Sequence, residues 1–523
     1  MTPSDPSPAK AISADIAPFV NDRRFFGHPL GLSTLFATEM WERFSFYGLR
    51  PLLILFMSAA LAEGGFGFDR TDAATIVGIY AASVDLASLP GGWIADRLLG
   101  LRRAILLGAV LITSGHLSIG LSGVAGVGAG KILFFLGLIL IVLGTGLLKP
   151  NISAIVGDLY PEGGARRDAG FSIFYMGINT GAFVGQLVTG WLGERVSWHY
   201  GFGAAGVGML AGLLWFWLRQ QATLGPIGKD IVRDPDPAVQ ARRESAVRNW
   251  TLGGLTTLAA VFAAAAAGLV TLSPQAIGQS MTIVLVGVAV AYFGYIFIFG
   301  GLDGDERKRV AVIFVLFVFA AIFWAAFEQA PTSLNLFAND FTDRSLFGWE
   351  VPATWFQSIN SAFIIIFAPV FAAVWVWMAK SGIELSSPAK FTLGLAVTTV
   401  GFAIMISAAN AVVASGGTVK VSPWFLIVSY LLQTFGELCI SPVGLSSMTK
   451  LAPRAYVGQM MGIWFLATSV GNLVAGLVGG HVDPTKLEQT PVVFTGTTIA
   501  LLVSTLILAA MIVPIRRMMA NVR

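Results

Sequence analysis

The sequence is poor in charged residues. Only 12% of its 523 residues are charged, against about 25% in soluble domains, while 55% are hydrophobic. So few polar side chains cannot coat a water-soluble globule of this size, and a single soluble core stops growing near roughly 250–300 residues. The composition therefore excludes a water-soluble enzyme and predicts a chain that lies in lipid.

Cysteine and histidine are also scarce, and hydrolase motifs are missing. The one cysteine, Cys439, allows no internal disulfide. Four histidines are too few for a two-metal site, and neither His-Glu-x-x-His nor Gly-x-Ser-x-Gly occurs. We therefore expect no intramembrane enzyme, no catalytic residue and no bound metal. We also expect no signal peptide, because the first 20 residues hold acids and prolines but no apolar run.

The sequence does contain long apolar stretches that are rich in glycine. A helix that crosses a bilayer needs about 20 apolar residues, and the 60 glycines allow helix backbones to approach closely. The pattern predicts closely packed membrane-spanning helices. The fourteen candidate spans lie near residues 30–60, 72–96, 104–123, 132–156, 169–193, 200–218, 250–272, 281–301, 310–337, 353–379, 391–413, 423–449, 457–480 and 492–514.

Lysine and arginine residues are divided unevenly between the loops. If both termini lie on one side, that side holds 24 of the 33 basic residues and the opposite side holds six. Because basic loops stay in the cytoplasm, we expect both termini there. The basic excess is thus interpreted as a topology signal, and no nucleic-acid partner is predicted. The six residues of the opposite side are Arg70, Lys131, Arg195, Arg344, Lys420 and Lys486.

The predicted spans fall into three groups. The hydrophilic stretch 219–249 is charged and proline-rich and follows the sixth span, so it is interpreted as a cytoplasmic linker. The predicted fold is an all-α polytopic membrane protein with two six-helix bundles and two extra helices between them. Its segments are a cytoplasmic tail (1–28), an N-terminal bundle (29–218), the linker (219–249), two accessory helices (250–301), a C-terminal bundle (302–515) and a second tail (516–523).

Eight ionisable residues lie within the spans, where each costs at least ~2.5–3.5 kcal/mol on insertion scales. Mutual pairing or an internal wet cavity must offset that cost. On the first span, a helical turn of about 100° per residue places Glu39, Arg43 and Arg50 on one stripe. Acids and bases there exchange partners when one acid binds a proton; a static salt-bridge cluster is the alternative. The eight are Glu39, Glu42, Arg43, Arg50, Asp85, Lys149, Glu328 and Glu437.

Ten further polar or aromatic groups lie at membrane depth in both halves. Each by itself is explained by a helix–helix hydrogen bond, but together they indicate a wet cavity. Asp85 is either a proton site or a helix-packing partner, and His116 is interpreted as a core histidine. The ten are Tyr80, Asn151, Tyr175, Asn179, Gln186, Trp324, Gln329, Asn360, Gln433 and Trp464.

Four segments carry a family resemblance. They are Glu39-x-x-Glu42-Arg43-Phe44-x-Phe46-Tyr47, the loop Gly91-Gly92-Trp93-Ile94-Ala95-Asp96-Arg97-Leu98-Leu99-Gly100, the run Phe174-Tyr175-x-x-Ile178-Asn179, and the segment 436–446. Together they resemble the proton-dependent oligopeptide transporters of the major facilitator superfamily, and the span count is that of the bacterial fourteen-helix form. The loop motif is shared by the whole superfamily, whereas the other three are specific in combination.

Two positions depart from the family pattern. Phe46 stands where the first tyrosine of a Tyr-Tyr pair is usual, so one hydroxyl is lost and peptide preference is expected to change. Thr180 replaces an aliphatic residue, with little expected effect.

The resemblance implies two sets of site residues. Arg43, Arg50 and Lys149 resemble the groups that meet a peptide carboxylate. The full peptide-binding set adds groups for the amino end and the pocket wall: Arg43, Tyr47, Arg50, Tyr80, Lys149, Asn179, Glu328, Asn360, Glu437 and Trp464. The proton-coupling set is Glu39, Glu42, Arg43 and Glu328.

The resemblance also implies two gating pairs, Arg50 with Glu328 on the outer side and Lys149 with Glu437 on the inner side. The residue types agree with this, because a dipeptide is a zwitterion that needs cations at one end and an acid with amides at the other. The cations come from the first half of the sequence, whereas Glu328 and Glu437 come from the second. A site divided between the two halves is what alternating access requires. Protonation of Glu328 would then remove the partner of Arg50 and let the outer side open.

We therefore expect a monomeric proton-coupled symporter that imports di- and tripeptides through the bacterial inner membrane. Its expected partners are peptides, the lipid bilayer and protons as the coupling ion, with no cofactor. A symporter of the same fold with another cargo, such as nitrate or a peptide-like metabolite, is the nearest alternative, although Glu437 would repel a small anion. A channel or a non-transporting sensor is a further alternative.

Overall fold

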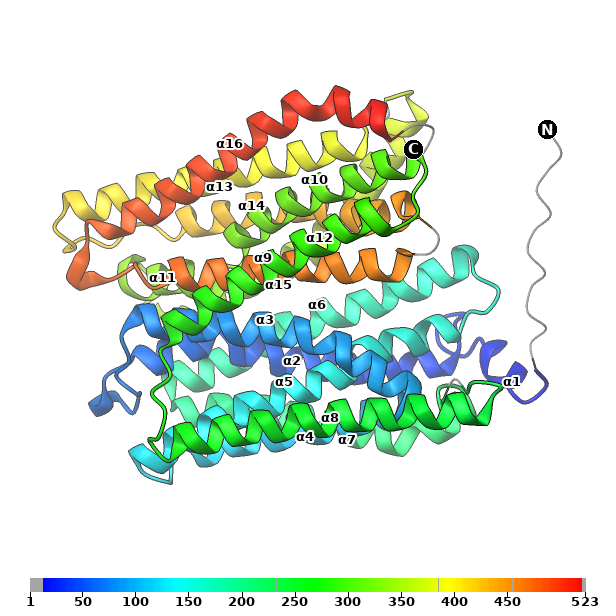
Figure 1. The fold of residues 1–523 in the computed structure, drawn as a ribbon. Coiled ribbons are helices and arrows are strands. Elements are labelled where there is room, and N and C mark those ends of the chain that lie inside the picture. Colours follow the sequence, from blue (N-terminus) through cyan, green and yellow to red (C-terminus); the bar gives the residue numbers. More distant parts are fainter. Residues whose placement is uncertain (1–12, 232, 384, 454–455, 520–523) are drawn as a thin grey trace. The chain divides into compact units, whose positions relative to one another are not determined.

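The computed structural model describes residues 13–519, apart from 232, 384, 454 and 455. Within the described residues, thirteen helices are long and apolar enough to cross a membrane. α2 (Leu30–Ser58) is a further helix of 29 residues that carries two glutamates and two arginines. The predicted all-α polytopic fold class is thus confirmed (Figure 1).

The helices are joined by short connections, and the one β-hairpin in the described part of the chain is formed by two strands of two residues each. η2 is a π-helical turn that directly follows α3, and η3 is a second π-helical turn that begins three residues after the end of α10. In chain order the elements are α1 (Ala17–Val20), α2 (Leu30–Ser58), η1 (Leu61–Glu63), α3 (Arg70–Ile94), η2 (Ala95–Leu99), α4 (Leu101–Leu121), α5 (Val127–Asp158), α6 (Gly164–Arg195), α7 (Trp198–Leu224), α8 (Pro237–Ala266), α9 (Pro274–Phe299), α10 (Gly304–Phe327), η3 (Ala330–Leu334), α11 (Asn335–Phe341), β1 (Ser345–Leu346), β2 (Trp349–Glu350), α12 (Trp355–Lys380), α13 (Ser387–Ala414), α14 (Trp424–Leu451), α15 (Val457–Gly479), η5 (Pro484–Lys486) and α16 (Gln489–Met518).

The chain divides into two compact units. The first unit comprises the residues up to Gly48 together with 87–189 and 199–271. The second comprises 49–86, 190–198 and the residues from Leu272 onward. The second unit therefore includes the last residues of α2, most of α3 and the connection between α6 and α7, in addition to the C-terminal helices.

Glycine brings the helices of the first unit close together. A Cβ atom at Gly108 or Gly115 of α4 would collide with the backbone of α5, which packs along α4. Gly181 and Gly185 of α6 are likewise in contact with the backbone of α2. Small residues permit such close approach in lipid, where packing rather than the hydrophobic effect holds helices together.

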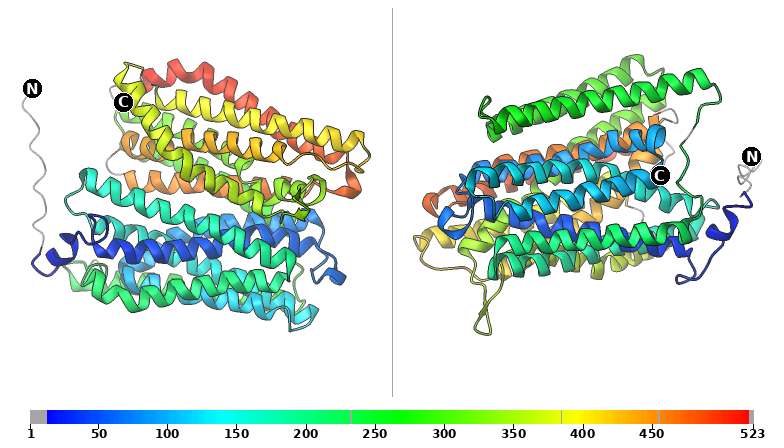
Figure 2. Two further views of the ribbon diagram at one scale, coloured as in Figure 1. Left: turned by 180° about the vertical axis from the view of Figure 1, so that it is seen from behind. Right: turned by 90° about the horizontal axis from the view of Figure 1, so that it is seen from below.

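The second unit is built in the same way. α13 packs between α14 and α16, and α10 packs against α15 (Figures 1 and 2). A Cβ at Gly436 would collide with Thr398, so α14 lies close against α13. Gly78 of α3 faces the backbone of Asn472 and Gly476 on α15, so α3 also lies close against α15.

The predicted linker over 219–249 is shorter in the structure. α7 continues to Leu224, and α8 already begins at Pro237. Asp236 caps α8 by accepting a hydrogen bond from the Ala238 amide at 2.8 Å, and proline is favoured at the first helical position. The charged residues after Pro237 thus lie on a helix rather than in a flexible segment.

The two accessory helices belong to different units. α8 contacts η2 within the first unit, whereas α9 contacts α15 and α10 within the second. On α9, the Tyr292 hydroxyl donates to Gln459 Oε1 at 2.8 Å and Gln275 Nε2 donates to Thr75 Oγ1 at 2.9 Å.

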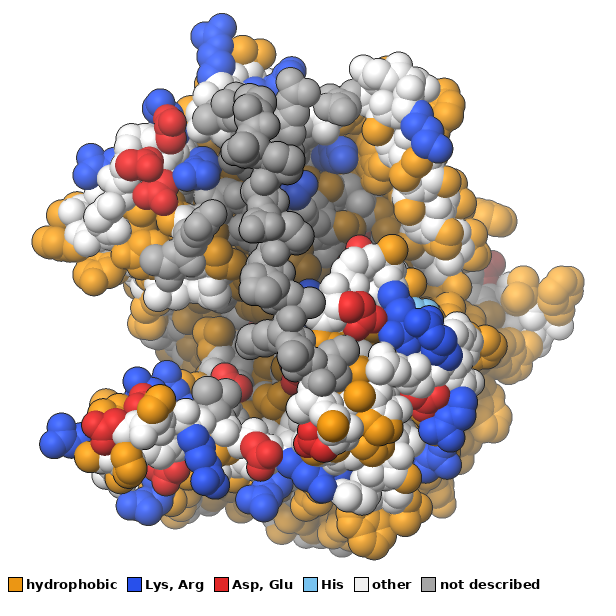
Figure 3. All heavy atoms as spheres, turned by 90° about the vertical axis from the view of Figure 1, so that its right-hand side faces the viewer, with side chains coloured by type: hydrophobic (Ala, Val, Ile, Leu, Met, Phe, Trp, Pro, Cys, Tyr) orange, Lys and Arg blue, Asp and Glu red, His pale blue; other side chains and the backbone are white. Residues whose placement is uncertain are grey.

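Polar and apolar side chains are separated as a bilayer requires. On the face drawn in Figure 3, acidic and basic side chains gather, and hydrophobic side chains lie around its edge.

Two of the charged residues inside the spans, Arg50 and Lys149, directly precede prolines within α2 and α5. Proline removes a backbone hydrogen bond and bends a helix, so both cations lie at local irregularities.

Candidate functional site

The first unit contains a buried cluster of charges on α2. The Arg43 Nε atom lies 3.2 Å from Glu39 Oε1 and also pairs with Glu42. All three side chains are almost completely buried, with exposed fractions of 4% or less. Thr145 of α5 donates to Glu42 Oε1 at 3.4 Å. The cluster holds one cation between two carboxylates, so one proton brings it to neutrality.

Aromatic rings cover the cation of this cluster. The Arg43 guanidinium carbon lies 5.0 Å from the centre of the Phe46 ring and 5.9 Å from that of Tyr47. The two rings meet edge to face at 5.1 Å. Cation–π contact in a desolvated place is worth about 2 kcal/mol. Phe46, which departs from the family pattern, thus lies directly against the arginine.

Lys149 and Asn179 also belong to the first unit. Lys149 is half-buried near the middle of α5. Asn179 of α6 is 5% exposed, and its Nδ2 group donates to the Tyr175 carbonyl at 3.0 Å. The Glu39 Oε2 atom accepts no hydrogen bond from the described residues, although it is buried. Binding of a proton would reduce the cost of burying this carboxylate, and the proton-coupling role of Glu39 stays a prediction.

The second unit contains the predicted pair of Arg50 and Glu328. The Arg50 Nη2 group donates to Glu328 Oε2 at 2.6 Å, and both side chains are about nine-tenths buried. Glu328 follows the last residue of α10, and Gln329 separates it from the π-helical turn η3. Because α10 ends at this point, the Glu328 carboxylate does not take the position that a continuing helix would give it.

Asn472 is a partner of Arg50 that the sequence did not predict. The same Nη2 group donates to Asn472 Oδ1 of α15 at 2.7 Å, and Asn472 Nδ2 lies 3.5 Å from Asp85 Oδ2 of α3. Asp85, for which a proton site and a helix-packing contact both stay open, thus lies beside Asn472. An asparagine inside an apolar span is a weak signal by itself, because most such amides only join helices.

Glu437 and Asn360, both predicted for the amino end of a peptide, contact each other. The Asn360 Nδ2 group donates to Glu437 Oε2 at 3.3 Å and to Thr434 Oγ1 at 2.9 Å. Asn360 lies on α12, whereas Glu437 and Thr434 lie on α14. Such a carboxylate and amide oxygen suit an ammonium group. Lys149 belongs to the other unit, so its pairing with Glu437 stays a prediction.

The remaining predicted wall residues are buried in the second unit. Tyr80 of α3 is 3% exposed and Trp464 of α15 is 4% exposed. The Trp464 indole packs against Gly444 and against the ring of Phe391, whose centre lies 6.5 Å away. Tyr47 is half-buried in the first unit. Contact of these three side chains with a ligand stays a prediction.

A second ionic network joins the end of α6 to the start of α12. Glu194 accepts hydrogen bonds from the backbone amides of Ala353 at 2.7 Å and Thr354 at 2.9 Å. It also accepts one from the Thr354 hydroxyl at 2.7 Å and lies 3.5 Å from the Arg344 guanidinium. The sequence analysis used Arg344 only to assign sides, because partners this far apart in sequence give no local signal.

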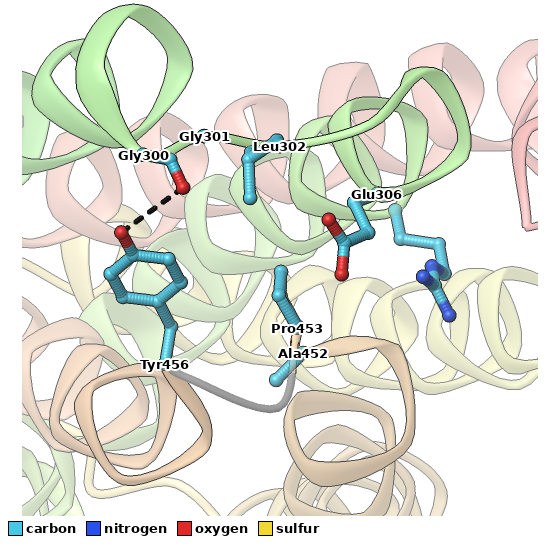
Figure 4. Close-up of a pocket in the computed structure, with 8 residues that line it drawn as sticks. Gly300, Gly301, Leu302, Glu306, Ala452, Pro453 and Tyr456 are labelled. Atoms are coloured by element: carbon cyan, nitrogen blue, oxygen red, sulfur yellow. Dashed lines mark hydrogen bonds between the residues drawn. The ribbon is translucent and has the colours of Figure 1, made fainter.

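Two cavities of the second unit lie away from the predicted residues. One, of about 430 Å³, is lined by Arg70, Asp340 and neighbours of Glu194. The other, of about 380 Å³, lies between the start of α10 and the connection of α14 to α15, where Tyr456 donates to the Gly300 carbonyl at 3.2 Å (Figure 4). Among the described residues, no group of three His, Cys, Asp or Glu side chains gathers as a metal site would require.

Buried, paired charges within long helices that are apolar enough to cross a membrane, or that pack among such helices, are typical of a polytopic membrane transporter. Comparison with known proteins is consistent with this class. The model of the POT family, PTR2, matches residues 102–493. The chain belongs to the POT family, as its motifs predicted, and it has the fold of the major facilitator superfamily.

Curated relatives and solved structures match along almost the whole chain. The peptide transporter YePEPT of Yersinia enterocolitica is 48% identical over 95% of this chain and 97% of its own length. A di-/tripeptide transporter of Lactococcus lactis subsp. cremoris is 35% identical over 96% and 99%. The structure of a peptide transporter POT in complex with sulfate superposes with a TM-score of 0.86 at 39% identity, covering 97% and 99%.

Proposed function

We propose that this protein is a proton-coupled symporter that imports di- and tripeptides by alternating access. The observation that carries the proposal is the buried ion pair of Arg50 and Glu328, which joins the first span to the C-terminal half. The stability of this contact depends on whether Glu328 holds a proton. The proposal is supported by relatives whose names describe peptide or di-/tripeptide transporters.

The charges suit the two ends of a peptide. Arg43 and Lys149 belong to the first unit and Arg50 to the second, and they would attract a carboxylate. Asn360 and Glu437 already contact each other and would accept hydrogen bonds from an ammonium group. The aromatic side chains Phe46 and Tyr47 would provide an apolar wall for the variable part of the ligand.

Ionic contacts of the second unit join segments from the two halves of the sequence. Arg50, Arg70 and Glu194 come from the N-terminal half of the sequence, and each binds a residue of the C-terminal half. These contacts involve the helix ends that the basic-residue count assigns to the outer side. We infer that they hold these helix ends together within the second unit.

The surroundings of the protein follow from the same reasoning. The chain would lie in the bacterial inner membrane, with both termini in the cytoplasm, because 24 of the 33 basic residues then face inward. Protons would be the coupling ion, and no cofactor or nucleic acid would be needed. A monomer contains all the residues that the proposal uses, and no covalent reaction takes part.

Uptake into proteoliposomes tests the function. Labelled dialanine should accumulate when the outside is acidic, and accumulation should stop when a proton ionophore collapses the gradient. Equal flux with and without the gradient would indicate a channel instead. Uptake that nitrate or 5-aminolevulinic acid inhibits, but di- and tripeptides do not, would indicate another cargo; the structure of one POT relative, 34% identical with a TM-score of 0.84, contains 5-aminolevulinic acid.

A further inference from the structure

The cavity of Figure 4 brings an acid and a base of α10 together with two helix connections. Its volume of about 380 Å³ lies within the range of about 300–1,000 Å³ that is usual for ligand pockets. All the residues that line it belong to the second unit. They include Glu306 and Arg309 near the start of α10, Gly300 after the end of α9, and Tyr456 before the start of α15.

Glu306 and Arg309 do not neutralise each other. They lie three residues apart on one helix, yet among the described residues neither forms an ion pair with the other. Glu306 Oε2 accepts from the Asp303 amide at 3.1 Å, whereas Oε1 accepts no hydrogen bond from the described residues. Arg309 donates none to them, although its Nε atom is buried, and Asp305, which interacts with it electrostatically, is paired with Lys308. One carboxylate oxygen and one guanidinium thus stay available to a ligand.

The cavity lies beside an apolar surface of α9. Ile298 and Phe299 directly precede Gly300 and are 70% and 71% exposed. Tyr295, one turn before Phe299, is 58% exposed, and the two ring centres lie 5.8 Å apart. Because α9 is long and apolar enough to cross a membrane, these exposed side chains suit contact with acyl chains. The charged cavity and the apolar surface together resemble the two parts of a phospholipid.

The charges of the cavity distinguish between headgroups. A phosphate would pair with Arg309, and a primary ammonium group would donate to Glu306. A choline group fits less well, because quaternary ammonium is bound by cages of aromatic rings, and Tyr456 is the one aromatic residue among the described residues of the lining. A headgroup with negative charge alone would be repelled by Glu306. The cavity therefore favours a headgroup that carries both a phosphate and a primary ammonium group.

The position of the cavity agrees with a headgroup at the membrane surface. It lies where α9 ends and α10 begins, on the side that the basic-residue count assigns to the cytoplasm. The Tyr456 hydroxyl donates to the Gly300 carbonyl at 3.2 Å and so joins the α14–α15 connection to the α9–α10 connection. Figure 4 shows the Glu306 carboxylate pointing toward Pro453 of the α14–α15 connection. A headgroup bound here would contact both connections.

We propose that this cavity binds the headgroup of a phospholipid with a primary ammonium group, such as phosphatidylethanolamine. Arg309 holds the phosphate, Glu306 accepts from the ammonium group, and the acyl chains lie along α9. The bound lipid stabilises the junction between the α9–α10 and α14–α15 connections. This site goes beyond the proposed function, because neither residue belongs to the predicted peptide-binding or proton-coupling sets.

Native mass spectrometry of the purified full-length protein tests the site directly. Delipidated protein in detergent should retain added phosphatidylethanolamine about tenfold better than phosphatidylcholine or phosphatidylglycerol with the same acyl chains. Glu306→Gln keeps the capping pattern at the start of α10 but loses the charge, and Arg309→Gln loses the cation. Each should abolish the preference, and the matched control Arg307→Gln, at an exposed position of the same helix, should keep it. Equal retention of the three lipids by wild-type protein, or an unchanged preference in either cavity variant, would overturn the proposal.

Thermal unfolding separates a lipid from a soluble zwitterion. Phosphatidylethanolamine should raise the Tm of wild-type protein more than phosphatidylcholine does, and this extra rise should be absent from Glu306→Gln and Arg309→Gln. An equal extra rise in either variant would contradict the site. Displacement of the lipid by dialanine would show that the cavity takes a soluble zwitterion and would also overturn the proposal. Because neither measurement uses transport, the proposed function can fail while this site stands.

Discussion

Arg50 and Glu328 lie 278 residues apart in the sequence, and their side chains meet at 2.6 Å. Arg50 is on the first long helix, and Glu328 follows the last residue of α10. Both side chains are about nine-tenths buried, so the contact is shielded from water and its strength depends on charge. The pair therefore links the protonation of one carboxylate to the position of the first helix.

Replacement of Glu328 by glutamine should uncouple uptake from the proton gradient. The amide has nearly the shape of the acid but cannot take up or release a proton. We expect concentrative uptake of dialanine by Glu328→Gln to be lost, while exchange of peptide across the membrane continues. Concentrative uptake at the wild-type level would rule out a coupling role for Glu328. Glu350→Gln, which changes an acid that is about two-fifths exposed, is the matched control and should behave as wild type.

The inner pair gives a second prediction. Lys149→Ala and Glu437→Ala should each reduce peptide uptake by about tenfold or more, because each removes a charge proposed to hold one end of the ligand or the inner gate. If the two residues pair with each other, the double variant should be no worse than the single ones. Losses that multiply would show that the two residues act independently, and wild-type uptake by either single variant would remove it from the site.

A substitution of Phe46 should change which peptides the protein prefers. Its ring lies 5.0 Å from the Arg43 guanidinium carbon and meets Tyr47 edge to face. Phe46→Tyr adds a hydroxyl beside the predicted peptide site without changing any charge. A panel of competing dipeptides should be ranked differently by this variant, with the pH dependence of uptake kept. The same ranking would show that the departure at this position has no effect on selectivity.

Glu194 should stabilise the contacts between α6 and the start of α12. Its carboxylate is 8% exposed and accepts from two backbone amides and one hydroxyl at the start of α12. Glu194→Gln replaces one acceptor with a donor, and the loss is expected to cost about 1–3 kcal/mol. The Tm should fall measurably, whereas Glu488→Gln, at an exposed position, should change it little. Equal Tm values for both variants would contradict a structural role for Glu194.

His28 should make the fold sensitive to acid. Its Nδ1 atom lies 2.9 Å from the Tyr160 hydroxyl, and burial, with a smaller contribution from Arg166, lowers the pKa of His28 below its ordinary value of 6.5. Below pH 6.5 the unfolded chain therefore binds a proton that the native state resists, so stability falls as the pH falls. The Tm of wild-type protein should drop more between pH 7.5 and 5.5 than that of His28→Asn. Parallel curves would show that His28 does not contribute.

Helices and charges could be predicted because they are local properties. Span positions followed from apolar runs of about 20 residues, and the stripe of Glu39, Arg43 and Arg50 followed from the helical repeat. The predicted ends of helices were less accurate where a capping residue decides where the helix begins. Asp236 and Pro237 start α8 inside the stretch that composition alone assigned to a linker.

Partners across the fold were harder to predict. Asn472 and Glu194 are ordinary residues in the sequence, and they become parts of ionic networks only where α15 meets α3 and where the end of α6 meets the start of α12. The resemblance to a family suggested the partner of Arg50, but neither Asn472 nor Asp85 had a family role to transfer.

The sequence by itself determined the solvent of this protein, the number of its long helices and the family to which it belongs. Hydrophobicity, helical periodicity and short motifs are written along the chain and need no folding to be read. Only the tertiary structure decided which acid pairs with which base, because an ion pair forms between atoms that are close in space. That proximity comes from glycines such as Gly78 and from helix ends such as Glu328, which let particular side chains meet after the helices have packed.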